Sequence, residues 1–157
     1  MEKIKPYVIS IGIALAVGGL SAVLTMGNMD IYEKVNTPPL SPPSILFPIV
    51  WTALYILMGI SASIIYQNKQ SNTDEAYCGI KSYAISLFFN FMWSIFFFNL
   101  RWFKFAFFWL LALLFLIIKT IVCYFKVNKL AAYLQIPYAI WVAFAGYLNF
   151  DIWMLNK

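Results

Sequence analysis

The residues best suited to chemistry in this chain are aromatic rings and neutral amides that recur at helical spacing. On a helix, side chains four residues apart share a face, and four of them do so here: Trp141, Ala145, Asn149 and Trp153. Ala145 and its neighbour Gly146 leave a dent between the two indoles, and such a dent suits a flat apolar molecule. The alternative is that a neighbouring helix packs tightly against the small residues.

A second aromatic stripe lies earlier in the chain. Phe47, Trp51 and Tyr55 are also spaced by four residues. A stripe of this kind predicts either an aromatic belt at a membrane interface or the wall of an interior site. The position of Trp51, about two turns into an apolar run, favours the interior site.

A polar stripe precedes the third group of aromatic residues. Ser82, Ser86 and Asn90 share a helix face, and Trp93 continues it. Lipid offers no hydrogen-bond partner, so an asparagine at bilayer depth must pair with protein or with a ligand. The stripe therefore predicts either a clamp between helices or an amide directed at the polar edge of a ligand.

The residue inventory excludes several function classes. There is no histidine, which excludes histidine-ligated haem and any catalytic triad or general base built on histidine. Cys78 and Cys123 share no short-range spacing, so we expect no metal site and interpret both as apolar fillers. The formal charge is +5, but the basic residues are scattered, so no nucleic-acid partner is expected. No cofactor is required.

The elements that must position these side chains are transmembrane helices. Apolar residues make up 63% of the 157 residues and charged residues 11%, against roughly 45–50% and 25% in soluble domains. The core of a chain of this length is too small to bury this much apolar surface. Lipid must therefore be the solvent. We expect an all-α membrane protein, a single domain over residues 1–157 forming a bundle of five transmembrane helices, at approximately residues 7–26, 44–66, 79–99, 103–125 and 130–155.

Connections and termini add three expectations. The first run could be a signal peptide, but Gly18-Gly19 suits helix contact and favours a retained span. Five spans place the termini on opposite faces, and the basic residues weakly favour a cytoplasmic N-terminus. The polar loop 28–43, which contains Tyr32, is long enough to act as a lid.

Three segments together resemble the TspO/MBR family, the tryptophan-rich sensory proteins and mitochondrial translocator proteins. The resemblance covers essentially the whole chain and rests on Pro38-Pro39-Leu40-Ser41-Pro42-Pro43 with Phe47 to Tyr55 and Met58-Gly59, on Asn90 to Ser94 with Phe96-Phe97, and on Pro137-Tyr138 with Trp141, Phe144-Ala145 and Leu148-Asn149. It implies a five-helix bundle in a cell membrane, commonly a homodimer, that binds porphyrins, sterols and benzodiazepine-type drugs. A seam of small residues on the third span could serve a dimer or face the bundle interior: Cys78, Ser82 and Ser86.

The resemblance also implies a ligand pocket. Carried over by motif, its residues are Tyr32, Trp51, Tyr55, Asn90, Trp93, Trp141 and Ala145, and the helical stripe adds Phe47. The chain departs from the family pattern at Thr37, where lysine is frequent, at Val35, where leucine is usual, and at Phe150, where animal members carry the tyrosine of their sterol motif. Sterol is therefore not expected as the natural ligand.

Three functions are consistent with this pattern. The first is a membrane receptor for porphyrins of the protoporphyrin IX type, whose flat faces stack on tryptophan and tyrosine. The second is an enzyme that degrades protoporphyrin IX with light and oxygen, with Trp51 or Trp141 in the redox role. The third is a tetrapyrrole or sterol transporter, although the lack of a coupling carboxylate within the membrane argues against an ion-driven carrier.

Overall fold

Five long helices make up most of the protein. The computed structural model describes residues 3–28 and 45–156. The expected loop lid at 28–43 and Tyr32 within it lie outside the described residues, apart from Asn28. The long helices are α1 Lys5–Thr25, α3 Leu46–Gln67, α4 Thr73–Ser94, α5 Phe103–Phe125 and α6 Lys129–Leu155. Shorter turns accompany them: the 3₁₀ turns η1 Met26–Asn28 and η2 Lys69–Ser71, and the π-helical segment η3 Ile95–Asn99 that continues α4.

All five long helices have the length and hydropathy needed to cross a membrane. This confirms the expected all-α fold with five spans. α4 begins at Thr73, before the apolar run that starts near Gly79. The added turn carries Asp74 and Glu75, whose carboxylates interact favourably with the positive end of the helix dipole. Hydropathy alone misses such a turn because its residues are polar.

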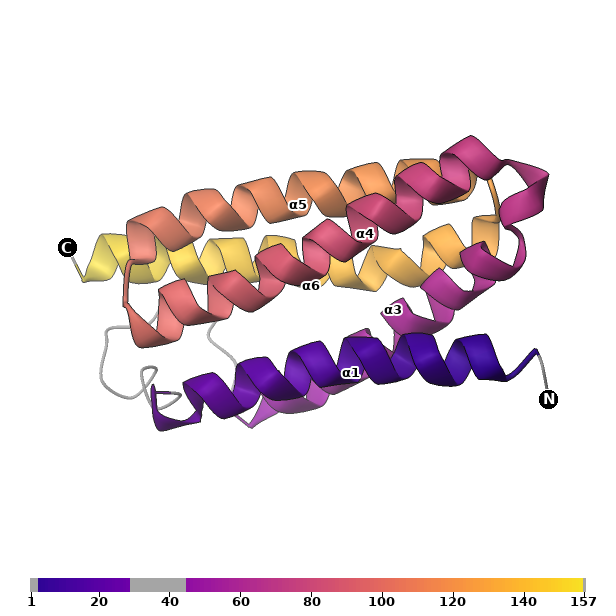
Figure 1. Ribbon diagram of the computed structural model, residues 1–157. Helices are drawn as coiled ribbons and strands as arrows, with labels where there is room; N and C mark the ends of the chain where they lie inside the picture. Colours follow the sequence, from indigo (N-terminus) through magenta and orange to yellow (C-terminus); the bar gives the residue numbers. More distant parts are fainter. Residues whose placement is uncertain (1–2, 29–44, 157) are drawn as a thin grey trace.

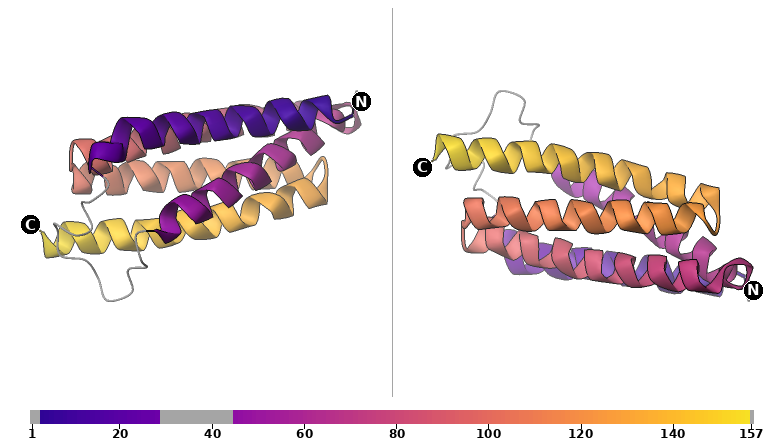
Figure 2. Two further views of the ribbon diagram at one scale, coloured as in Figure 1. Left: turned by 90° about the horizontal axis from the view of Figure 1, so that it is seen from below. Right: turned by 90° about the horizontal axis from the view of Figure 1, so that it is seen from above.

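The helices form two layers with the chain ends at opposite ends of the bundle (Figure 1). α4, α5 and α6 lie side by side, and α3 crosses obliquely between α6 and α1 in the second layer (Figure 2). α1 packs mainly on α3, and its contact with α4 is much smaller. The first helix is therefore the least enclosed of the five.

Two glycines set how closely α1 and α3 approach. A Cβ on Gly59 would lie 2.6 Å from the backbone Cα of Ile11, and a Cβ on Gly18 would overlap the ring of Tyr55. By contrast, no atom of the described residues lies within 4 Å of the corresponding position on Gly19. Gly18, rather than the pair expected from the sequence, makes the helix contact.

The outer surface of the bundle is apolar, as a lipid solvent requires. Phe115 and Ile140 are 67% and 65% exposed. Ser82 and Ser86 point the other way and are buried within the chain. The small-residue seam on α4 therefore packs inside the bundle, so those two serines are unavailable for a dimer contact.

Candidate functional site

A cavity between α1, α3, α4 and α6 gathers the residues that the sequence singled out. It lies toward the end of the bundle that carries the C-terminus, and its volume is about 90 Å³. Seven of the eight predicted residues line it: Phe47, Trp51, Tyr55, Asn90, Trp93, Trp141 and Ala145. The structure brings these side chains together, and their binding of a ligand stays a prediction.

The aromatic wall is built mainly by α3 and α6. The rings of Trp51 and Tyr55 stack with centroids 5.7 Å apart and 30° between their planes. Trp141 of α6 meets Trp51 edge-on at 6.5 Å and Phe47 at 5.9 Å. The α3 stripe thus faces a cavity inside the bundle. Large π-faces at right angles can hold a flat ligand by one face and contact its rim with the other ring.

Asn90 forms an interhelical bond, as one interpretation of the polar stripe on α4 predicts, and its contact with a ligand stays a prediction. Its Nδ2 donates to the hydroxyl oxygen of Tyr55 at 3.0 Å, which ties α4 to α3, and the residue is 1% exposed. The same side chain lines the cavity. Gly18 of α1 packs against the Tyr55 ring, so three helices fix its position.

A second amide ties three helices beside the cavity. The indole Nε1 of Trp93 donates to Oδ1 of Asn149 at 3.0 Å. Asn149 Nδ2 in turn donates to the backbone carbonyl of Phe103 at 2.8 Å. This joins α4, α6 and α5, and it commits the N–H of Trp93 to the protein. Trp93 can therefore offer a ligand its ring but not its hydrogen-bond donor.

Trp141 differs from Trp93 in this respect. Its Nε1 is buried and has no hydrogen-bond partner among the described residues. Leaving such a donor unpaired costs about 1–3 kcal/mol. Because Trp141 lines the cavity, its indole is the natural donor to an acceptor atom on a bound molecule.

The last member of the α6 stripe does not reach the cavity. Trp153 packs against Phe107, Phe108 and Phe150, and Lys104 Nζ lies 5.8 Å from its ring centroid. A helix turns by about 100° per residue, so a spacing of four drifts by about 40° at each step. Three steps carry Trp153 about 120° away from the face of Trp141, a drift that the grouping of all four residues on one face did not take into account.

Sequence reasoning missed the α1 wall of the cavity. That wall consists of small side chains, Gly18, Ser21, Ala22 and Thr25. Their spacing of three and four residues is a signal for one helix face. The π-helical segment after α4 was also missed; it brings Phe98 to the cavity, and such segments are frequent at functional sites.

A second hollow of about 600 Å³ lies between α1, α3 and α4, toward the N-terminal end. Apolar side chains such as Ile9 and Leu87 dominate its lining, with Lys5 at its edge. It opens along the side where α1 and α4 touch little. It contains none of the tryptophans and neither interhelical amide, so the smaller cavity is the candidate site.

Comparison with known proteins gives a consistent relationship over the whole chain. The TspO/MBR family model matches residues 10–154. The chain is 34% identical over 157 residues to the tryptophan-rich protein TspO of Chlorobaculum tepidum, covering 99% of this chain and 98% of that one.

Two further relatives come from another bacterium and from a mammal. Protein CrtK of Rhodobacter capsulatus is 34% identical over 139 residues, covering 88% of this chain and 85% of that one. The translocator protein of Bos taurus is 32% identical over 156 residues, covering 97% and 92%. With five membrane-spanning helices and matches of this extent, the chain belongs to the TspO/MBR family.

Proposed function

We propose that this protein is a membrane receptor that binds a porphyrin of the protoporphyrin IX type in the tryptophan-lined cavity. The observation that carries the proposal is the cavity lining: Trp51, Tyr55 and Trp141 present π-faces, and the Trp141 N–H is a buried donor without a partner among the described residues. A porphyrin offers both complements, a broad π-surface and polar acceptors at its edge. The homodimer implied by the family stays a prediction.

Binding must enlarge the cavity. Pockets for molecules of this size measure about 300–1,000 Å³, whereas the cavity measures about 90 Å³. α1 provides one wall and packs little on α4. We expect α1 to move outward and the rings of Trp51 and Trp141 to separate when the macrocycle enters. Binding should therefore be slow compared with diffusion.

The test is a titration of the full-length protein in lipid nanodiscs with protoporphyrin IX in darkness. Trp141→Phe keeps a ring but removes the N–H, so affinity should fall roughly three- to tenfold, the equivalent of about 0.5–1.5 kcal/mol. Trp153→Phe is the matched control, because Trp153 lies on the same helix but outside the cavity. No binding by wild type, or an equal loss in both variants, would disprove the proposal.

The second candidate function is light- and oxygen-dependent degradation of protoporphyrin IX. It is favoured by the contact between Trp51 and Trp141, two oxidisable indoles 6.5 Å apart that line one cavity. An absorbance time course in light and in darkness separates the functions. A receptor bleaches the porphyrin in light no faster than a protein-free control does, whereas an enzyme accelerates the bleaching in light. Trp51→Phe and Trp141→Phe should then stop the bleaching while binding largely persists.

A further inference from the structure

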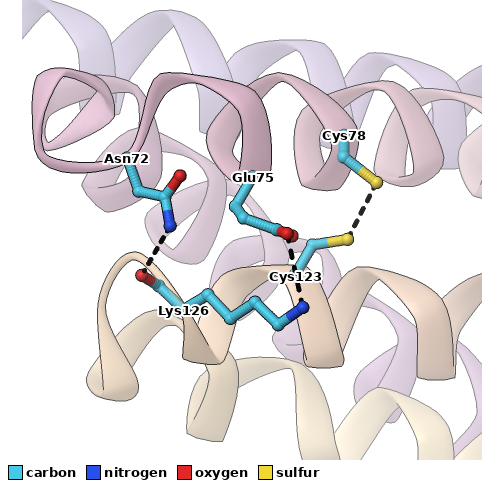
Figure 3. Close-up of polar contacts among 5 residues, drawn as sticks. All are labelled: Asn72, Glu75, Cys78, Cys123 and Lys126. Atoms are coloured by element: carbon cyan, nitrogen blue, oxygen red, sulfur yellow. Dashed lines mark hydrogen bonds and ion pairs between the residues drawn. The ribbon is translucent and has the colours of Figure 1, made fainter.

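A compact group of potential metal ligands lies at the opposite end of the bundle from the cavity. Glu75 is in the first turn of α4, Cys78 is one turn later, and Cys123 is in the last turn of α5 (Figure 3). The two Sγ atoms are 2.9 Å apart. A carboxylate oxygen of Glu75 and both sulfur atoms all lie within 4.8 Å of one another.

Close helix packing brings these side chains together. A Cβ on Gly79 would lie 2.5 Å from the ring of Tyr124 and 3.3 Å from Cβ of Cys123. Glycine at this position therefore lets α5 approach α4 closely, right beside the two thiols. Glu75 and Cys78 are three residues apart and share a helix face. Cys123 is 45 residues from Cys78 in sequence, so no spacing rule could have paired them.

We propose that Glu75, Cys78 and Cys123 bind one thiophilic divalent cation, with Zn²⁺ the best match. Two thiolates and one carboxylate are three of the four ligands of a tetrahedral zinc site, and water supplies the fourth. Zn–S bonds of about 2.3 Å put the two sulfur atoms about 3.8 Å apart, so the thiols must separate slightly. Each forms a Zn–S bond as its S–H proton leaves to solvent.

The site is accessible from the aqueous phase. The Glu75 side chain is 28% exposed, Cys78 is half-buried, and Cys123 is buried beneath them. Thr73 begins one candidate membrane span and Phe125 ends another, so the group lies at the ends of two spans, where transmembrane helices meet water. An ion can therefore reach the carboxylate first and then the two thiols, without crossing lipid.

Lys126 is the natural competitor of the cation. Its Nζ lies 3.3 Å from Glu75 Oε1, and its side chain is 56% exposed. The ammonium group neutralises the carboxylate when no metal ion is bound, and it is free to swing into solvent when one arrives. Removing this charge should tighten metal binding. If the ion pair only held the site in shape, removing it would weaken metal binding instead.

The experiment titrates full-length, reduced protein in nanodiscs with Zn²⁺ against a chromophoric zinc indicator, and with Co²⁺ as a spectroscopic probe. Wild type should bind one Zn²⁺ per chain, and the Co²⁺ form should show thiolate-to-cobalt charge-transfer absorption. Glu75→Gln should weaken Zn²⁺ binding about tenfold or more. Lys126→Met should strengthen it. Asp74→Asn, a charge loss at the exposed neighbouring residue, should change nothing.

Cys78→Ser and Cys123→Ser should each abolish the charge-transfer band. Bound Zn²⁺ should also protect both thiols of the wild-type protein from alkylation, a readout that does not depend on any variant folding. The proposal is overturned if reduced wild type binds no Zn²⁺, or if binding is unchanged in the serine variants. A Cys78–Cys123 disulfide in unreduced protein, with no Zn²⁺ bound after reduction, would identify a redox pair instead.

Discussion

Single hydrogen bonds between side chains decide how the aromatic residues of the cavity can act. Trp93 and Trp141 both line it, yet one N–H is bonded to Asn149 and the other has no partner among the described residues. The family resemblance implied one pocket for both indoles but could not distinguish them. The distinction depends on which helix lies opposite each nitrogen.

Asn149 should contribute to stability through its two interhelical hydrogen bonds. Asn149→Leu removes the acceptor of the Trp93 N–H and the donor to the Phe103 carbonyl. Interhelical hydrogen bonds in membrane proteins average about 0.6 kcal/mol, with a maximum near 1.7, so the loss of two should lower stability by roughly 1–3 kcal/mol. Reversible unfolding in mixed micelles measures this. Thr52→Val is the control, since its exposed hydroxyl donates to the Pro48 carbonyl of its own helix.

If Asn149→Leu were no less stable than Thr52→Val, the amide would not be an interhelical clamp. Sequence reasoning anticipated this side chain on the α6 stripe, but as part of a slot for a ligand. The structure shows that its polar atoms are bonded to α4 and α5. A sequence shows that a buried amide needs a partner, whereas the identity of that partner depends on packing between distant segments.

At the level of elements, helix existence followed from the sequence and helix contacts did not. Apolar runs of about twenty residues predict spans because the bilayer fixes their length. The fourth predicted span is α5, and it has the bounds expected from its apolar run, Phe103–Phe125. The π-helical segment Ile95–Asn99 and the positive φ of 55° at Arg101 were not predicted. Both arise where α4 must turn back into α5, which no local propensity indicates.

The α1–α3 contact can be tested with two glycine substitutions that should change stability in opposite directions. A Cβ on Gly59 would lie 2.6 Å from Ile11 Cα and 2.8 Å from its backbone nitrogen. Backbone cannot move aside as a side chain can, so Gly59→Ala should destabilise the bundle by about 1–3 kcal/mol. Gly19→Ala meets nothing within 4 Å and should stabilise it by up to about 1 kcal/mol, the helix-propensity gain.

Thermal unfolding of both variants in the same detergent measures these effects. Equal shifts of the unfolding temperature in the same direction would contradict the close approach of α1 and α3 at Gly59. The pair also tests the proposed opening of the cavity. Because Gly59 fixes α1 against α3, Gly59→Ala should loosen α1 and speed porphyrin entry, whereas Gly19→Ala should leave the association rate unchanged.

At the scale of the whole molecule, the two proposed sites lie at opposite ends of the bundle. The tryptophan-lined cavity lies toward the C-terminal end, and the group of Glu75, Cys78 and Cys123 lies at the other. Cys78 and Asn90 are twelve residues apart on one helix, which is about 18 Å. A metal ion bound at the cysteines therefore cannot contact a molecule in the cavity, so each proposal can fail without affecting the other.

Because the two cysteines lie far from the cavity, the residue types around the cavity determine which porphyrin should bind. The protein has no histidine, and the described residues that line the cavity include no cysteine or methionine. Among the described lining residues, Tyr55 is the one whose type can ligate haem iron, but its hydroxyl already accepts a hydrogen bond from Asn90. The described lining residues thus offer iron no strong axial ligand. We expect haemin to bind no more tightly than metal-free protoporphyrin IX.

Competition titrations of the two porphyrins in darkness, on wild type and on Tyr55→Phe, test this expectation. Since stacking on the indoles provides the binding energy in both cases, the ratio of the two dissociation constants should stay near one or favour the metal-free ring. Tyr55→Phe should weaken both ligands equally through the lost contact with Asn90. Clearly tighter haemin binding that disappears in Tyr55→Phe would instead identify Tyr55 as an iron ligand and the protein as a haem receptor.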